Sequence, residues 1–152
     1  MTLSILDTSS KRPLANIRKT IIIYLVLSFT TIGIDNIYAV FGHGVRSPSM
    51  TWMFLYPLIG GTLVYFLIKI FFPWINHFLG YRLFSNLYNS GIATLTVGSF
   101  LKGILEIAGT SSPYTILFFV TGWLLTASGI ILLAVLAANR QKIGTFLSEG
   151  NR

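Results

Sequence analysis

The sequence contains no cysteine, which excludes disulfide bonds, thiolate metal ligands, thiol redox chemistry and lipid attachment to a cysteine. Charged residues are also scarce: they make up 10% of the 152 residues, whereas a soluble domain carries about 25%. Hydrophobic residues make up 53%, and the mean hydropathy is +0.73. Because so few charges cannot cover a water-facing surface, we expect lipid to be the solvent of most of the chain.

Acidic residues are especially rare, with four against eleven basic residues. Two of them, Asp7 and Glu149, belong to the terminal tails, so no pair of carboxylates has the spacing that acid/base catalysis needs. The basic residues lie between and beside apolar runs and form no stripe interleaved with aromatics, which argues against nucleic acid as a partner. The two histidines, His43 and His77, are expected on opposite sides of a membrane and should not share a metal. We predict no cofactor.

Four apolar runs predict the fold. Each is long enough to cross a hydrocarbon core of about 30 Å, which takes about 20 helical residues. Helices are required because backbone groups in lipid must be bonded within their own segment. We therefore predict an all-α membrane protein, a four-transmembrane-helix bundle occupying residues 20–139 between tails at 1–19 and 140–152. The predicted helices are 21–41, 52–72, 87–107 and 114–138.

The first apolar run has an alternative interpretation as a cleavable signal peptide. Basic residues precede it, and Gly42-His43-Gly44 offers small residues near a cleavage point. Against this, the apolar stretch is long for a signal peptide, and Asp35 and Asn36 interrupt its end. We favour a retained helix.

Lysine and arginine predict the orientation, because cytoplasmic connections are enriched in them. Both tails and the connection between the second and third runs carry most of these residues. The first connection has only Arg46, and residues 109–113 have none. Both termini should therefore be cytoplasmic, with the protein in a bacterial plasma membrane. Membrane lipids are the first expected partners, since basic residues near the surface attract anionic headgroups.

Aromatic residues fit the predicted interfaces, where tyrosine and tryptophan are enriched. Trp52 and Tyr114 are expected at the outer interface, and Trp74 and Tyr81 at the inner one. Trp123 lies deeper in its run and is expected to pack against another helix. The inner half of the bundle is otherwise predicted to be mostly apolar.

A faint internal repeat suggests two repeated helical hairpins. Ser47-Pro48 follows the first outer turn and Ser112-Pro113 the second, each with a threonine shortly after. Such halves would form a parallel repeat about an axis along the membrane normal. The alternative is simpler, because serine followed by proline is a common way to begin a helix.

The third run carries small and polar residues at intervals of four. An α-helix advances about 100° per residue, so this row drifts around the helix and cannot face one neighbour throughout. Its small members are expected to let helices approach closely, and its hydroxyls to bond across interfaces. A polar pathway or a ligand cleft is the alternative. In the second run, Pro57 and the glycine pair suggest a kink or a close crossing. The predicted packing residues are Gly60, Gly61, Ser90, Gly91, Thr94, Gly98 and Gly103.

Charged residues inside the runs give the candidate site. Lys102 and Glu106 lie one turn apart and can pair. Asp35 is expected at a similar depth, where a charge is costly unless it has a partner inside the bundle. We predict one network of Asp35, Lys102 and Glu106. A neutralised pair near the interface is the alternative for Lys102 and Glu106.

A glycine-rich loop, residues 42–48, is predicted to cover this network. Its glycines permit turns with positive φ. The result would be an outward-facing polar pocket that binds a ligand or ion. Its predicted residues are Asp35, Asn36, Tyr38, His43, Arg46, Lys102 and Glu106. The alternative for His43 is an ordinary solvated loop residue.

Function is less constrained than fold. The leading hypothesis is a non-enzymatic protein that helps to move a small polar solute or serves as a subunit of a membrane complex. The second is a small enzyme acting on a lipid or quinone at the outer leaflet. The third is a structural or regulatory assembly partner. Transport would require a homo-oligomer or other membrane subunits, because four helices leave little room for a lumen.

Overall fold

The computed structural model describes the backbone of residues 17–71 and 79–149 and the side chains of residues 17–71 and 80–138. All regular secondary structure among these residues is helical, and four helical segments are long and apolar enough to cross a membrane, as predicted. The predictions for the N-terminal tail, Trp74 and His77 concern residues outside those that the structure describes. The elements are α1 (Ile17–Phe41), α2 (Pro48–Thr51), a π-helix η1 (Tyr56–Leu63), α3 (Val64–Phe71), α4 (Leu79–Ile107) and α5 (Thr115–Glu149).

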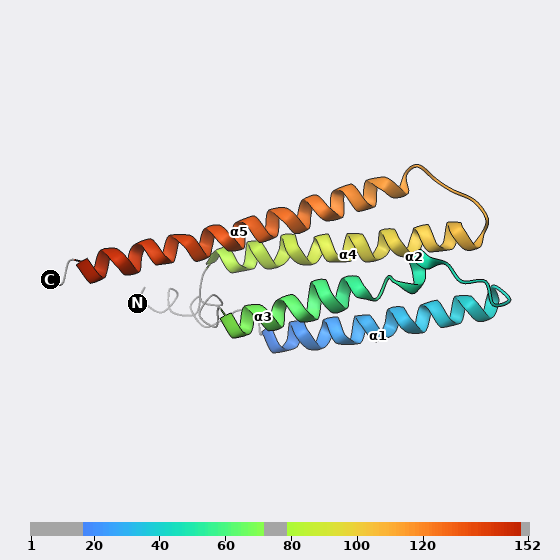
Figure 1. Cartoon of the computed structure of the whole chain (residues 1–152), viewed down its shortest axis with the longest axis horizontal. Coiled ribbons are helices and arrows are strands. Elements are labelled where there is room, and N and C mark those ends of the chain that lie inside the picture. Colours follow the sequence, from blue (N-terminus) through green and yellow to red (C-terminus); the bar gives the residue numbers. More distant parts are fainter. Residues whose placement is uncertain (1–16, 72–78, 150–152) are drawn as a thin grey trace, which may run out of the picture.

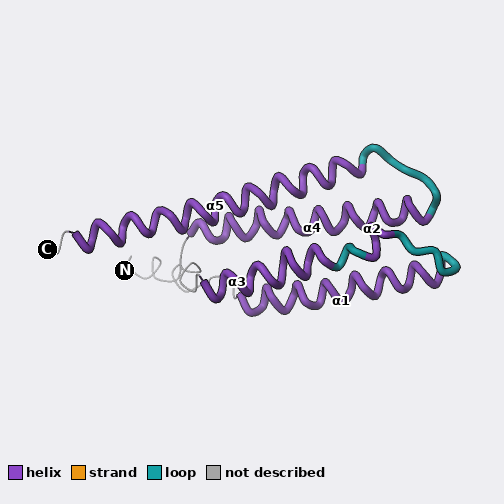
Figure 2. The backbone as a smooth tube through the Cα atoms, viewed as in Figure 1, coloured by secondary structure: helices purple, strands orange, loops and turns teal. Residues whose placement is uncertain are grey.

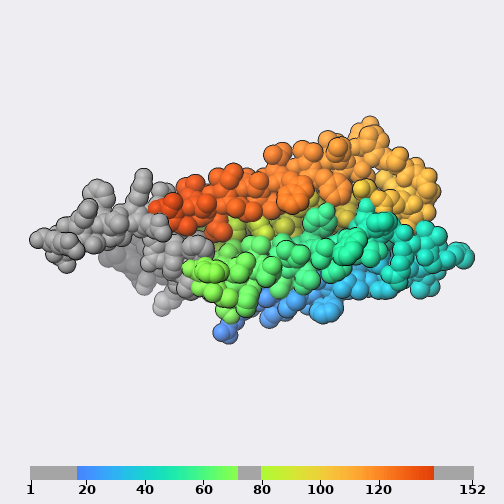
Figure 3. Space-filling model, in the orientation of Figure 1, coloured from blue at the N-terminus to red at the C-terminus, as the bar shows by residue number. Residues whose placement is uncertain are grey.

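The helices form two hairpins that lie side by side (Figure 1). One hairpin is α1 with α2, η1 and α3, and the other is α4 with α5. Both connecting loops, residues 42–47 and 108–114, lie at the same end of the molecule, which we call the loop end (Figure 2). The start of α1 and the end of α5 lie at the opposite end, the terminus end. The described residues make an elongated body (Figure 3).

The four helical segments form an open arrangement rather than a closed four-helix bundle with a square cross-section. Among the described elements, α5 packs extensively only on α4, and α4 packs in turn on α2 and η1. The segment α2–η1–α3 then packs on α1. Helices α1 and α5 therefore lie on opposite flanks, and much of the surface of each is apolar and exposed.

Glycines form the seam between α4 and α5. A Cβ added at Gly91 would lie 2.9 Å from the carbonyl oxygen of Gly122, and one added at Gly98 would lie 2.6 Å from the Cβ of Phe118. Gly129 likewise faces the backbone of Tyr88. Small residues allow this close approach, which in lipid replaces the hydrophobic effect as the source of helix association.

The second apolar run is not one regular α-helix. Ser47 accepts a hydrogen bond from the backbone N–H of Met50, and Pro48 begins the short helix α2. The chain then forms the π-helix η1, which contains Pro57, a residue without a backbone N–H. A π-helix of eight residues is unusual, since this form mostly occurs as single turns and often at functional sites.

Left-handed residues end α1 and α4. His43 has φ +55° and Gly44 has φ +87°, and the N–H of Gly44 donates to the carbonyl of Ala39. Gly109 has φ +68°, and the N–H of Thr110 donates to the carbonyl of Leu105. Both ends have the bond from C″ to C3 that satisfies the last carbonyls of a helix.

Two aromatic residues lie elsewhere than expected. Tyr81, predicted at the inner interface, is fully buried, and its hydroxyl has no hydrogen-bond partner among the described residues. Trp123, predicted to pack against a helix, is 60% exposed. The reason is the open arrangement, because α5 packs on α4 with one face and leaves the Trp123 face uncovered. Trp52 and Tyr114 are exposed towards the loop end.

Candidate functional site

At the loop end, Asp35 pairs with Arg46. The Arg46 guanidinium lies 3.2 Å from the Asp35 carboxylate and also donates to the side-chain oxygen of Asn36 at 3.2 Å. The hydroxyl of Thr51 donates to the other Asp35 oxygen at 3.3 Å. The Asp35 side chain is only 9% exposed, so these bonds supply the partners that a buried carboxylate needs.

Glu106 belongs to a second cluster. Its carboxylate accepts hydrogen bonds from the hydroxyl of Ser47 and, at 2.7 Å, from the hydroxyl of Ser49. Lys102 lies 3.8 Å from the same carboxylate, while its ammonium also sits 5.9 Å from the ring centre of Phe119 on α5. The Lys102–Glu106 contact is therefore present, but serines supply the closer partners.

The predicted single network of Asp35, Lys102 and Glu106 is wrong. Arg46 replaces Lys102 as the partner of Asp35, because the loop after α1 turns back over that carboxylate. Lys102 turns towards α5, consistent with the drift of its row around α4. Segment 46–51 lies between the two carboxylates and is bonded to both.

Through these bonds the charged residues have a structural role, which is to hold segment 46–51 in place. Asp35 on α1 holds one side of the segment, and Glu106 on α4 holds the other. The hydroxyl of Ser99 adds a bond of 2.6 Å to the carbonyl of Ser49, and Met50 is buried against Gly103. The space assigned to a polar pocket thus contains α2. His43 is exposed in the loop above it.

The predicted packing residues divide into two groups. The glycines lie against neighbouring elements: Gly60 against Ile92, Gly61 against Tyr24, Gly91 against Thr126, Gly98 against Phe118 and Gly103 against Met50. The hydroxyl residues behave differently. Thr94 donates to the carbonyl of Ser90 in its own helix at 2.7 Å, and Ser90 is exposed. Neither bonds to another helix among the described residues, contrary to the expectation of hydroxyl bonds across an interface.

A buried polar network that the sequence did not predict lies nearer the terminus end. The side-chain oxygen of Asn89 accepts hydrogen bonds from the hydroxyls of Tyr24 at 2.7 Å and Tyr65 at 2.6 Å. Its amide nitrogen donates to Ser85 at 3.3 Å, and Ser85 lies 3.0 Å from the Tyr65 hydroxyl. One amide therefore joins α1, α3 and α4, in a region predicted to be mostly apolar.

Aromatic rings surround this network. Tyr65 stacks on Tyr24 with ring centres 5.8 Å apart and meets Tyr88 edge-on at 6.0 Å. The Tyr88 hydroxyl donates to the carbonyl of Gly60 in the π-helix at 2.6 Å. Tyrosine suits such a place because its ring packs in an apolar core while its hydroxyl needs a partner. The signal available in the sequence was the presence of these tyrosines inside apolar runs.

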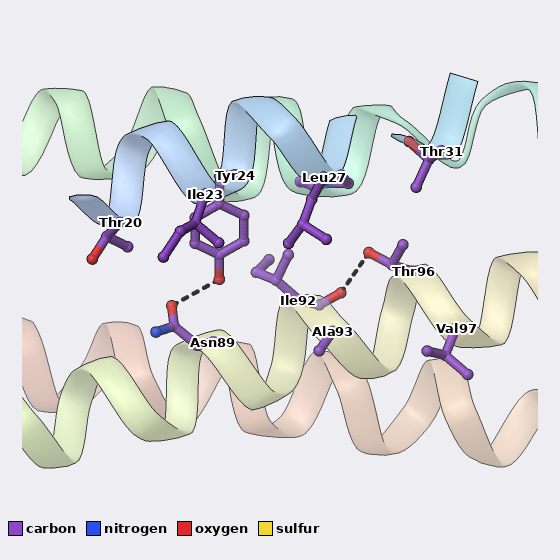
Figure 4. Close-up of a pocket in the computed structure, with 11 residues that line it drawn as sticks. Thr20, Ile23, Tyr24, Leu27, Thr31, Asn89, Ile92, Ala93, Thr96 and Val97 are labelled. Atoms are coloured by element: carbon purple, nitrogen blue, oxygen red, sulfur yellow. Dashed lines mark hydrogen bonds between the residues drawn. The ribbon is translucent and has the colours of Figure 1, made fainter. Parts of the chain in front are cut away.

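Beside the network, a cleft of about 390 Å³ separates α1 from α4 (Figure 4). Helix α1 lines it with Thr20, Ile23, Tyr24, Leu27 and Thr31. Helix α4 lines it with Asn89, Ile92, Ala93, Thr96 and Val97, and η1 contributes Pro57. None of these residues is charged, so the cleft suits an apolar occupant.

The polar groups of the cleft are unevenly placed. The hydroxyls of Thr31 and Thr96 donate to carbonyls of their own helices at 2.8 Å each. The Tyr24–Asn89 bond crosses between the two helices towards the terminus end (Figure 4). Beyond Thr31, the ring of Tyr38 meets Phe100 edge-on at 5.7 Å and brings α1 and α4 together at the loop end. The cleft thus has polar groups towards the terminus end, and beyond its loop-end side α1 and α4 meet through two aromatic rings.

No group of three or more histidine, aspartate and glutamate side chains that could hold a metal ion occurs among the side chains that the structure describes. Comparison with known family models, curated proteins and solved structures finds no match to this chain. The function of the protein must therefore be inferred from the site alone.

Proposed function

We propose that this protein is a non-catalytic integral membrane protein that binds a lipophilic molecule in the cleft between α1 and α4. The observation that carries the proposal is the cleft itself. It is uncharged, it is apolar over most of its lining, and it lies between two helices of membrane-spanning length. Ligand pockets commonly combine such a lining with a few placed polar groups. Here Tyr24 and Asn89 supply those groups.

Asn89 supports a ligand with one hydrogen-bonding group. A side-chain amide has two N–H donors and an oxygen with two acceptor sites. Both acceptor sites are used by Tyr24 and Tyr65, and Ser85 takes one donor. The remaining donor is suited to a carbonyl or hydroxyl oxygen at the polar side of the cleft.

Transport of a polar solute has less support than binding of an apolar molecule. The loop-end carboxylates, which were expected to contact such a solute, are bonded to Arg46, Thr51 and two serines of the same chain. The location of the protein in a bacterial plasma membrane, with cytoplasmic termini, remains part of this proposal. A role as a subunit of a membrane complex is compatible with it, because much exposed apolar surface lies outside the cleft.

Filling the cleft tests the proposal. Ala93 is exposed on the cleft wall, so Ala93→Phe places a ring in the cleft without displacing a buried neighbour. Ala127→Phe, on an exposed face of α5, is the matched control. We expect native mass spectrometry of the intact protein to show a retained lipophilic molecule in the wild type and in Ala127→Phe, and at least about tenfold less in Ala93→Phe, equivalent to about 1.4 kcal/mol. Equal retention by both variants, or none by the wild type, would overturn the proposal.

A further inference from the structure

Charge is distributed unequally along the described bundle. The two described acidic side chains, Asp35 and Glu106, lie at the loop end and are bonded within the fold. The described basic side chains at the terminus end are Arg18, Lys19, Lys69 and Arg82, and all are exposed. Among the described side chains, those of this end therefore carry positive charge alone.

Arg82 stands on the same face of α4 as the cleft. It precedes Asn89 by two helical turns, and residues at this spacing lie on one face about 10 Å apart along the axis. Helices α1 and α4 run in the same direction, and the Tyr24–Asn89 bond fixes their relative height. Arg82 is therefore level with the start of α1, where Arg18 and Lys19 lie.

From these positions we infer that the occupant of the cleft is an anionic phospholipid, with one acyl chain in the cleft and its phosphate on Arg82. This inference rests on the proposed function and names its ligand. A distance of about 10 Å along the helix fits the step from headgroup to upper acyl chain, because the polar regions of a bilayer add roughly 5–7 Å on each side of the hydrocarbon core.

The chemistry of the two parts matches this lipid. The guanidinium of arginine is a planar fork that binds phosphate through two parallel hydrogen bonds, and it stays charged at any relevant pH. With the phosphate on Arg82, the ester carbonyls lie between the levels of Arg82 and Asn89, and the acyl chain begins near Asn89. The acyl chain then follows Leu27 and Ala93 towards the Tyr38–Phe100 contact, which lies about 21 Å from Tyr24 along α1.

The test measures lipid preference in nanodiscs that contain equal amounts of phosphatidylglycerol and phosphatidylcholine. Native mass spectrometry of the full chain released from them counts the bound lipids of each kind. We expect the wild type to prefer phosphatidylglycerol. Arg82→Gln should lower that preference about fivefold, corresponding to about 1 kcal/mol for one basic residue near the surface. Lys69→Gln is the matched control, because Lys69 is an exposed basic residue at the same end but belongs to α3, an element that does not line the cleft.

The outcomes separate this inference from the proposed function. If Lys69→Gln lowers the preference as much as Arg82→Gln, anionic lipid is attracted by overall charge and the assignment of the phosphate to Arg82 is wrong, while the cleft still binds lipid. If Ala93→Phe retains as much lipid as the wild type, the cleft is not the site and both proposals fail. Retained lipid with no preference for phosphatidylglycerol overturns the anionic ligand alone.

Discussion

Asn89 shows how one residue can organise a membrane bundle. Its amide oxygen accepts two tyrosine hydroxyls from other helices, and its nitrogen donates to Ser85. In lipid, no water is present to replace a lost partner, so each of these groups depends on the others. The same amide also borders the cleft, which makes it both a structural residue and a candidate ligand contact.

Replacing Asn89 by leucine should destabilise the bundle. The change removes three hydrogen bonds and leaves Tyr24 and Tyr65 without their shared acceptor. With an average of about 0.6 kcal/mol for a hydrogen bond in a membrane bundle, we expect a loss of about 1–2 kcal/mol. Reversible unfolding by denaturing detergent, followed by circular dichroism, measures it.

Asn86→Leu provides the control for this change. Asn86 is exposed on the same helix and forms no hydrogen bond among the described residues, so its loss should leave stability unchanged or raise it slightly. Equal destabilisation by the two substitutions would show that the amide of Asn89 has no special part in joining the helices.

At the scale of elements, close packing of complementary surfaces holds α4 and α5 together. Gly91 and Gly98 on α4 and Gly122 and Gly129 on α5 bring the two backbones together, and bulkier neighbours such as Leu95 fill the adjacent positions. The row of small residues in the third run did indicate close packing. It could not indicate which residues faced α5, because the row drifts around the helix.

Gly91→Ala should weaken this hairpin. The new Cβ would lie 2.6 Å from the backbone nitrogen of Thr126 and 2.9 Å from the carbonyl oxygen of Gly122, and backbone atoms cannot move aside as side-chain tips can. Overpacking of this kind costs about 1–3 kcal/mol. The midpoint of thermal unfolding in detergent should fall accordingly.

Gly33→Ala is the counterpart on α1. No atom lies within 4 Å of a Cβ added there, and alanine favours a helix over glycine by up to about 1 kcal/mol. Its unfolding midpoint should remain the same or rise. If the unfolding midpoint of Gly33→Ala falls as much as that of Gly91→Ala, then replacing a glycine is harmful even where no neighbour is close. The effect at Gly91 would then reflect backbone flexibility rather than close approach of the helices.

For the whole molecule, an even number of membrane-length helices places the beginning and the end of the bundle at one end (Figure 1). The basic residues of that end predict that it faces the cytoplasm. The bundle is also open, with α5 attached by one face, so a large apolar surface is available to lipid or to another protein.

Single cysteines test the predicted orientation, and the absence of native cysteine makes the test direct. A membrane-impermeant maleimide should label Thr110→Cys, in the loop between α4 and α5, in intact cells. Ser148→Cys, near the end of α5, should be labelled only after the cells are permeabilised. The reverse pattern would invert the orientation and place the Arg82 site in the opposite leaflet.

The candidate site was predictable in part. Asp35, Lys102 and Glu106 stand out in the sequence because a charge in an apolar run must find a partner, and Arg46 is the one charged residue of the loop between the first two runs. Their actual pairing was not accessible from spacing, since it depends on how the loop after α1 returns as α2. The cleft was missed because most of its lining consists of ordinary apolar residues and threonines, which carry no chemical signal in a sequence.

What the sequence determined by itself was the solvent, the helical class and the number of spans, because these depend on the length and composition of each run and on the need to satisfy backbone groups in lipid. Only the tertiary structure decided which side chains meet. Helix rotation and height determine the distance between Tyr24 and Asn89, the ion pair between Asp35 and Arg46, and the gap between α1 and α4. Those are set by the close contacts of glycines, tyrosines and α2 with their neighbours, and they are not encoded in the spacing of residues along any one helix.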